Sequence, residues 1–224
     1  MPQFDFDKNY IKYIIFDMDG VLINSEPVTT KAAQTALSEI GIDAAPDAFK
    51  AYIGAGEDKF ITEICKEKKK EAKIPVAMAR MYELFYEYVY ESLEVFPNVH
   101  KLLDALKEKG YHLAIASSSA SEKVSASLEA AKIAESYFDV IITGSDVTQK
   151  KPSPEIYFIT MDELDADPEE CIIIEDALNG IRAAKDSDAF CFAVTTSFTR
   201  DAIEAEDPDF IGDDIIEVLD ILKK

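Results

Sequence analysis

Two aspartates follow a short apolar run near the start of the 224-residue chain. Residues 13–16 are Tyr-Ile-Ile-Phe, and Asp17, Met18, Asp19 and Gly20 come directly after them. An apolar run that stops at turn residues is typical of a strand buried on both faces of a parallel sheet. Alternation along an extended chain places Asp17 and Asp19 on the same side. Because neighbouring carboxylates repel each other, this pattern indicates a site for a cation or a shared proton, although a solvated turn is the alternative.

Polar clusters occupy three other predicted strand ends or the loops beside them. Residues 117–119 are all serine, Lys150 and Lys151 precede a proline, and residues 175–176 (Glu-Asp) follow an apolar run at 172–174. The serines can cap the next helix, or they can hold phosphate oxygens near its start. Two lysines before a proline are by themselves typical of a surface loop. Since open α/β sheets bind ligands at the carboxyl ends of their strands, we expect the clusters to converge there.

Strands and helices alternate from residue 97 onward. The pattern predicts strands at 111–116, 138–142, 171–174 and 190–194, and helices at 98–109, 121–132, 153–164 and 177–187. This alternation is typical of right-handed βαβ units. The predicted fold class is therefore α/β, with a doubly wound, parallel, Rossmann-like sheet to which the strand at 13–16 also belongs.

The segment between the first strand and residue 95 has helical spacing throughout. Helices are predicted at 27–40, 46–52, 57–73 and 75–93, the third of which ends in a charge run at 66–71 that we interpret as solvated. We therefore expect residues 22–94 to be an all-helical cap domain inserted into the sheet domain. That core domain would comprise residues 1–21 and 95–224.

Composition excludes several classes of function. The net charge of −21 argues against a nucleic-acid partner, because such proteins need basic surfaces. No apolar run approaches the ~20 residues that span a membrane, and the amino terminus lacks the basic and apolar regions of a signal peptide. The cysteines, at positions 65, 171 and 191, fit neither a disulfide framework nor a zinc site. We expect a cytoplasmic protein with a small-molecule partner.

The order and spacing of the four polar clusters resemble the four motifs of the haloacid dehalogenase superfamily. Residues 17–22 (Asp-Met-Asp-Gly-Val-Leu) and 24–27 (Asn-Ser-Glu-Pro) are similar to the first motif of its β-phosphoglucomutase-like phosphatase and mutase subgroup. The resemblance implies that Asp17 is the nucleophile and Asp19 the general acid/base. It also implies phosphate-binding residues, Ser117, Ser118 and Lys151, and metal ligands, Asp17, Asp19, Glu175 and Asp176.

General chemistry supports the same prediction. Phosphoryl transfer requires positioning and charge neutralisation more than elaborate covalent chemistry. Oxygen ligands without a nearby histidine or cysteine favour Mg²⁺. We expect a Mg²⁺-dependent phosphatase that hydrolyses a small phosphorylated metabolite, with sugar phosphates as the expected class, through an aspartyl phosphate.

A phosphomutase of the β-phosphoglucomutase type is the main alternative. Such enzymes grip a second phosphate with an arginine in the cap loop, and the matching loop here is Gly54, Ala55, Gly56 and Glu57. An acidic residue at the arginine's place disfavours a second phosphate. Where those mutases place a lysine and an asparagine after the motif-two serine, this chain has residues 120–121, Ala-Ser. These departures favour hydrolysis, with the cap loop as the expected specificity element.

A receiver domain that only accepts a phosphoryl group is a further alternative, because it too uses an aspartate, a lysine and Mg²⁺ on a doubly wound sheet. Function does not follow from fold. Two features argue against a receiver: Asp19 follows the predicted nucleophile by two residues, and the helical insertion is about half the size of a typical domain.

Overall fold

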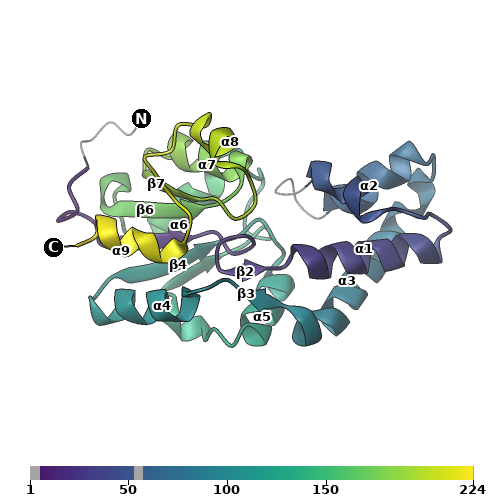
Figure 1. The fold of residues 1–224 in the computed structure, drawn as a ribbon, viewed down its shortest axis with the longest axis horizontal. Helices are drawn as coiled ribbons and strands as arrows, with labels where there is room; N and C mark the ends of the chain where they lie inside the picture. The colour runs from purple at the N-terminus through teal and green to yellow at the C-terminus, as the bar shows by residue number, and fades with distance from the viewer. Residues whose placement is uncertain (1–5, 53–57, 224) are drawn as a thin grey trace.

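The computed structural model describes residues 6–52 and 58–223. Its centre is a six-stranded, wholly parallel sheet in the order β5-β4-β1-β6-β7-β8 (Figure 1). The strands are β1 (Tyr13–Phe16), β4 (His112–Ala116), β5 (Val140–Ile142), β6 (Cys171–Glu175), β7 (Phe190–Val194) and β8 (Phe210–Gly212). The predicted α/β parallel sheet is confirmed.

Strand β1 lies in the middle of the sheet, between β4 and β6. Phe16 pairs with Ile115 of β4 and with Ile174 of β6, so all three strands end at the same level. Residues that directly follow these strands therefore emerge side by side at one edge. The backbone register alone therefore brings three of the four polar clusters to the same edge of the sheet.

Helices cover both faces of the sheet (Figure 1). They are α4 (Val99–Glu108), α5 (Ser121–Ala130), α6 (Glu155–Glu163), α7 (Leu178–Asp186), α8 (Arg200–Glu204) and α9 (Val218–Ile221). Alternation along β1 sends Ile14 and Phe16 into the hydrophobic layer with α4 and α5, and Ile15 into the layer with α6 and α7. Short 3₁₀ turns at Glu135–Tyr137, Pro168–Glu170 and Ile215–Glu217 complete this part.

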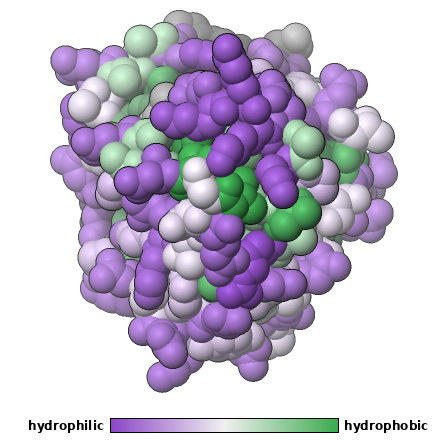
Figure 2. All heavy atoms as spheres, turned by 90° about the vertical axis from the view of Figure 1, so that its right-hand side faces the viewer, coloured by the Kyte–Doolittle hydropathy of each residue, from purple (hydrophilic) through white to green (hydrophobic). Residues whose placement is uncertain are grey.

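A group of helices lies beyond one end of the sheet (Figure 1). It consists of α1 (Glu26–Glu39), a 3₁₀ helix (Pro46–Tyr52), α2 (Asp58–Glu67), a 3₁₀ turn (Glu71–Lys73) and α3 (Ile74–Ser92). These helices bury an apolar cluster of their own, which includes Leu37, Ile61 and Phe85. Viewed from this end, the surface is mainly hydrophilic, with a smaller hydrophobic area near the middle (Figure 2). No helix in the described ranges is both apolar enough and long enough to cross a membrane.

A two-stranded antiparallel ribbon marks where the chain leaves the sheet and returns to it. Strand β2 (Ile23–Asn24) pairs with β3 (Glu94–Val95), Ile23 opposite Val95 and Asn24 opposite Glu94. The sequence analysis did not predict this ribbon. Two residues per strand are too few for an alternating pattern to be recognised.

The charge run in the third predicted cap helix folds differently from our expectation. Helix α2 ends at Glu67, and Lys69 adopts a left-handed conformation with φ of 55°. The Lys70 ammonium donates hydrogen bonds to the carbonyls of Ile40 (3.0 Å) and Gly41 (2.9 Å) after α1. Carbonyls at a helix end lack partners within the helix, so Lys70 ties two helices together where a solvated helix end was expected.

Candidate active site

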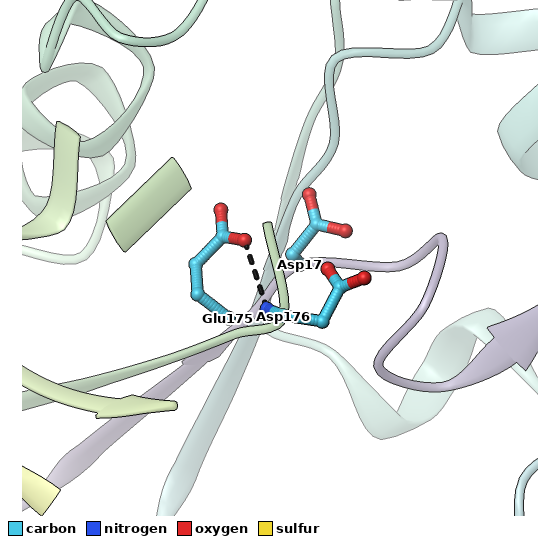
Figure 3. A group of neighbouring side chains, drawn as sticks. All are labelled: Asp17, Glu175 and Asp176. Atoms are coloured by element: carbon cyan, nitrogen blue, oxygen red, sulfur yellow. Dashed lines mark hydrogen bonds between the residues drawn. The ribbon is translucent and has the colours of Figure 1, made fainter. Parts of the chain in front are cut away.

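Three carboxylates meet at the carboxyl ends of β1 and β6. The Asp17 amide continues the ladder by donating to the Ile174 carbonyl at 3.0 Å, which holds Asp17 beside the end of β6. Asp17, Glu175 and Asp176 are buried, and one carboxylate oxygen from each lies within 4.8 Å of the others. The Asp17 and Asp176 carboxylates lie next to each other, and that of Glu175 lies on the other side of Asp17 (Figure 3).

Lys151 is the cation that the structure places among these carboxylates. Its Nζ donates to Asp17 Oδ1 at 2.6 Å, to Glu175 Oε1 at 2.7 Å and to the Ala116 carbonyl at 2.9 Å. The buried Tyr157 hydroxyl also donates to Glu175 Oε1. All three donor directions of the ammonium are therefore used, so Lys151 is fixed against β1, β4 and β6 at once.

One lysine does not balance three carboxylates. Burial raises the pKa of Asp17 to about 7; Lys151 opposes this, whereas Glu175 and Asp19 add to it. Burial, together with Asp17 and Glu175, raises the pKa of Asp176 well above its usual range. Both directions follow from the same imbalance, in which one lysine faces three buried carboxylates.

The donor set fits a metal ion. Ser197 donates to Asp176 Oδ2, while Asp176 Oδ1 is buried and has no hydrogen-bond partner among the described residues. A buried carboxylate oxygen without a partner is costly, and a cation would relieve that cost. Asp17, Glu175 and Asp176 offer only oxygen atoms, the donors that hard divalent cations prefer. These three side chains could thus hold a metal ion.

Asp19 has different surroundings from Asp17. Lys123 Nζ lies 3.1 Å from Asp19 Oδ1, Ser119 Oγ donates to Oδ2 at 2.8 Å, and Ser25 Oγ donates to Oδ1. Burial alone would raise the pKa of Asp19, but Lys123 and the two hydroxyls outweigh it and lower that pKa. Met18 between the two aspartates is fully buried, as the predicted alternation requires.

The three serines at 117–119 have different surroundings. Ser117 is buried, and its Oγ accepts a hydrogen bond from the Ser119 amide at 3.2 Å, which shapes the turn. Ser118 and Ser119 both line the cavity in front of the carboxylates. Of the serines predicted to bind phosphate, Ser118 therefore lies at the cavity, and Ser117 lies beneath it.

Two glycines allow the chain to pass close to the carboxylates. Gly20 has φ of 92°, and a Cβ there would lie 1.9 Å from Asp176 Oδ2. A Cβ at Gly180, in α7, would lie 2.0 Å from Glu175 Oε1. A side chain at either place would displace a carboxylate.

The site opens into a cavity of about 410 Å³ between the sheet edge and the helical segment. Lys150, Lys151, Asp17, Asp19, Glu175 and Asp176 line it on the sheet side. Thr29, Phe60 and Tyr82 line it from α1, α2 and α3. The cap-loop residues for which we predicted a specificity role, 54–57, lie outside the described residues.

The sequence analysis missed Lys123, which is 3% exposed. It belongs to the first turn of α5, where Nζ contacts Asp19 and the Ser119 hydroxyl (3.0 Å) and lies 5.1 Å from the centre of the Phe85 ring. Residues 120–121, where a cation would be expected by analogy with the mutases, are uncharged. The only available signal was its position four residues after Ser119, which places both on one face of a helix start.

Comparisons with known proteins agree on one family. The sequence profile of the haloacid dehalogenase-like hydrolases matches residues 14–194. Over 221 residues, 96% of its length, the chain is 34% identical to the chloroplastic protein SUPPRESSOR OF QUENCHING 1 of Arabidopsis thaliana, of which it spans 21%. It is 28% identical over 226 residues to the phosphoglycolate phosphatase of Vibrio vulnificus strain YJ016, covering 95% of this chain and 96% of that protein.

A solved structure extends the likeness to the fold. The putative β-phosphoglucomutase of Thermotoga maritima superposes with a TM-score of 0.79 at 27% identity. The match covers 95% of this chain and 99% of the other. Both the sheet and the helical segment therefore have counterparts in a solved protein.

Proposed function

The chain belongs to the haloacid dehalogenase-like hydrolase family, and we propose that it is a Mg²⁺-dependent phosphatase acting on a small phosphorylated metabolite through an aspartyl phosphate. One observation carries this proposal. Lys151 binds both Asp17 and Glu175 at 2.6 and 2.7 Å, in a cluster whose third carboxylate has an unpaired, buried oxygen. That arrangement suits a site that neutralises a phosphoryl group.

Asp17 is the proposed nucleophile. Its carboxylate oxygen would attack phosphorus, forming an O–P bond while the ester P–O bond breaks. Lys151 would hold the attacking carboxylate in place and balance the charge that gathers on the phosphoryl oxygens. Ser118, with the turn that Ser117 supports, would orient those oxygens.

Asp19 is the proposed general acid and base. The charge of the bound phosphoryl group would raise its pKa, and Asp19 would then give a proton to the leaving oxygen in the first step. In the second step it would take a proton from a water molecule that attacks phosphorus. The bond to Asp17 then breaks, releasing inorganic phosphate and restoring the free carboxylate.

Mg²⁺ is the proposed cofactor, held by Asp17 with Glu175 or Asp176 and by the Asp19 main chain. When bound, it would neutralise charge on the phosphoryl oxygens and the carboxylates. The unpaired Asp176 oxygen and the raised pKa values of Asp17 and Asp176 support a cation here.

We further propose that residues 22–94 are a cap and that residues 1–21 and 95–224 are the core. Each part buries a separate apolar cluster, and the cavity is lined from both. The β2–β3 ribbon is the proposed hinge region, near residues 21–27 and 93–97. Cap closure would exclude water from the site.

The phosphoglycolate phosphatase of Vibrio vulnificus supports a small phosphate monoester as substrate, and the putative β-phosphoglucomutase supports a phosphorylated sugar. A cavity of about 410 Å³ has room for either. Within this class we propose a sugar phosphate.

Phosphomutase activity is the second candidate, and Lys123 is the observation that favours it. This cation lines the cavity although the residues at 120–121 are uncharged. The Asp19 carboxylate already binds its Nζ at 3.1 Å, however, so we favour water over a second sugar phosphate as the acceptor of the phosphoryl group.

An assay with β-glucose 1-phosphate and a trace of glucose 1,6-bisphosphate distinguishes the two activities. Free phosphate as the main product supports hydrolysis, and glucose 6-phosphate supports the mutase.

The test of the proposal is a screen of phosphorylated metabolites, including p-nitrophenyl phosphate, with Mg²⁺ and with EDTA. We expect phosphate release that requires Mg²⁺ and disappears in Asp17→Asn. Full activity in EDTA, or an active Asp17→Asn protein, would exclude the proposed chemistry.

A further inference from the structure

Thr29 presents a hydroxyl that no described residue binds. It lies in the first turns of α1, is 5% exposed and lines the cavity. Its Oγ1 is one of the buried polar atoms without a hydrogen-bond partner among the described residues. A buried hydroxyl without a partner is unfavourable, and the position of this one beside a cavity points to a molecule that could satisfy it.

Two other helical threonines of this chain satisfy their hydroxyls locally. Thr35 Oγ1 donates to the Lys31 carbonyl at 2.9 Å, and Thr160 Oγ1 donates to the Ile156 carbonyl at 2.7 Å. This bond to the carbonyl four residues earlier is a usual choice for helical threonine. The equivalent carbonyl for Thr29 is that of Ser25, which accepts the Thr29 amide at 2.9 Å. The Thr29 hydroxyl does not use it.

The cavity around Thr29 favours a neutral polar group over an ionised one. Thr29 and Asn24 offer uncharged donors and acceptors to this cavity, and Phe60 and Tyr82 offer ring carbon to it. Glu26, which also lines it, offers a carboxylate that disfavours an anionic group. The Lys123 ammonium, which also lines the cavity, is bound by the Asp19 carboxylate and the Ser119 hydroxyl. A hydroxyl of the substrate matches a neutral hydroxyl, because each can donate to and accept from the other.

We propose that Thr29 is a specificity-determining residue whose hydroxyl binds a hydroxyl group on the organic part of the substrate. The substrate class is then a phosphate monoester of a polyol or sugar. This inference rests on the proposed function and deepens it by naming a group that the leaving part must carry. Thr29 takes no part in the bond-breaking steps.

The test compares Thr29→Val with the parent on substrates that differ in the leaving group. Valine keeps the shape of threonine and removes only the hydroxyl. For glycerol 3-phosphate and ribose 5-phosphate we expect kcat/KM to fall about tenfold, the value of one neutral hydrogen bond. For p-nitrophenyl phosphate, which has no hydroxyl on its leaving group, we expect a change of less than about twofold. Thr29→Ser should restore most of the loss.

Thr35→Val is the matched control. It removes a hydroxyl from the same helix, but one already bound to its own backbone. In Thr35→Val, hydrolysis of all substrates should stay unchanged.

The melting temperature of Thr29→Val should equal or exceed that of the parent, because no hydrogen bond within the chain is lost.

Three results would overturn the inference. The first is an equal loss on p-nitrophenyl phosphate and on the polyol phosphates, which indicates disturbed packing. The second is no loss on any substrate. The third, with 2-phosphoglycolate assayed beside the other esters, is a loss confined to that substrate, which would show that the hydroxyl serves a carboxylate. Failure of the proposed function would be a separate result, since the parent would then hydrolyse none of these esters.

Discussion

Asp17 and Asp19 are separated by one residue, and each has a buried lysine at hydrogen-bond distance. Asp17 shares Lys151 with Glu175, and burial, together with Glu175 and Asp19, raises its pKa to about 7. Asp19 has Lys123 and two hydroxyls that outweigh its burial and lower its pKa. One region has too little positive charge for its carboxylates, and the other has a carboxylate fully satisfied by its donors.

Asp17 and Asp19 are the same residue type, so the difference between their proposed roles follows from their different surroundings. A bound cation would lower the pKa of Asp17, as a nucleophile requires, and the charge of a bound phosphoryl group would raise the pKa of Asp19, as a proton donor requires. The region around Asp17 can accept a cation and a phosphoryl group, because both would relieve its excess negative charge. The region around Asp19 instead holds one carboxylate in a fixed orientation, as a proton donor and acceptor requires.

Removing the Asp17 carboxylate should have the largest effect. Asp17→Asn replaces the attacking oxygen by an amide, so we expect turnover to fall on the order of 10⁴-fold to 10⁶-fold. Steady-state phosphate release, with circular dichroism to check the fold, measures this. Activity within tenfold of the parent would mean that Asp17 is not the nucleophile.

Lys151→Ala removes the cation of the Asp17 region. We expect a loss of about 10²-fold to 10³-fold in kcat, the range for one electrostatic stabiliser. Lys150→Ala is the matched control. Lys151 Nζ lies 2.6 Å from Asp17 and 2.7 Å from Glu175, so the control should lose much less. The reverse ranking would contradict the assignment of Lys151.

Lys123→Met tests the Asp19 region. It removes a donor to Asp19 Oδ1, so we expect the acid to be poorly positioned and kcat to fall about 10-fold to 10²-fold with an alkyl phosphate, a fraction of what general acid catalysis contributes. The loss should shrink with p-nitrophenyl phosphate, whose leaving group needs little protonation. An equal loss with both esters would argue for a structural role of Lys123.

The smallest expected effect concerns stability against pH in the metal-free protein. The pKa of Asp17 is raised from 3.8 to about 7. The folded state therefore holds a proton between about pH 4 and pH 7 that the unfolded state releases. This contribution to stability is complete at low pH and is lost as pH rises through 7. In EDTA, Asp17→Asn should thus gain melting temperature relative to the parent between pH 5 and pH 7.5.

Added Mg²⁺ should reduce that difference, because a bound cation stabilises the ionised carboxylates. A difference in melting temperature between the two proteins that does not change with pH would contradict the raised pKa of Asp17.

The sequence predicted the sheet and the convergence of its polar clusters for a physical reason. Buried parallel strands are continuous apolar runs, so β1 and β6 are visible as residues 13–16 and 172–174, and the residues after them must share an edge. The groups around Asp19 were not predictable in this way. Ser25 reaches it from the residue before α1 and Lys123 from α5, and the placement of both helices depends on tertiary packing.

The orphaned Thr29 hydroxyl illustrates the same limit. Its position in a helix was predictable from spacing, but whether its Oγ1 would bond to the Ser25 carbonyl or point into a cavity was not. The β2–β3 ribbon was missed because its strands are only two residues long and their partners are distant in sequence. The turn at Lys69 was missed because it is closed by local bonds to Lys66 and Cys65 without a glycine to mark it.

The most direct test of the account uses Asp19→Asn with p-nitrophenyl phosphate and Mg²⁺. This ester needs little help from a general acid, so Asp17 can still be phosphorylated, while release of its phosphoryl group to water loses its base. We predict a burst of about one p-nitrophenolate per protein chain followed by slow turnover. Borohydride reduction and mass spectrometry should place the phosphoryl group on Asp17. Turnover without a burst, or a phosphoryl group on another residue, would contradict the division of roles between Asp17 and Asp19.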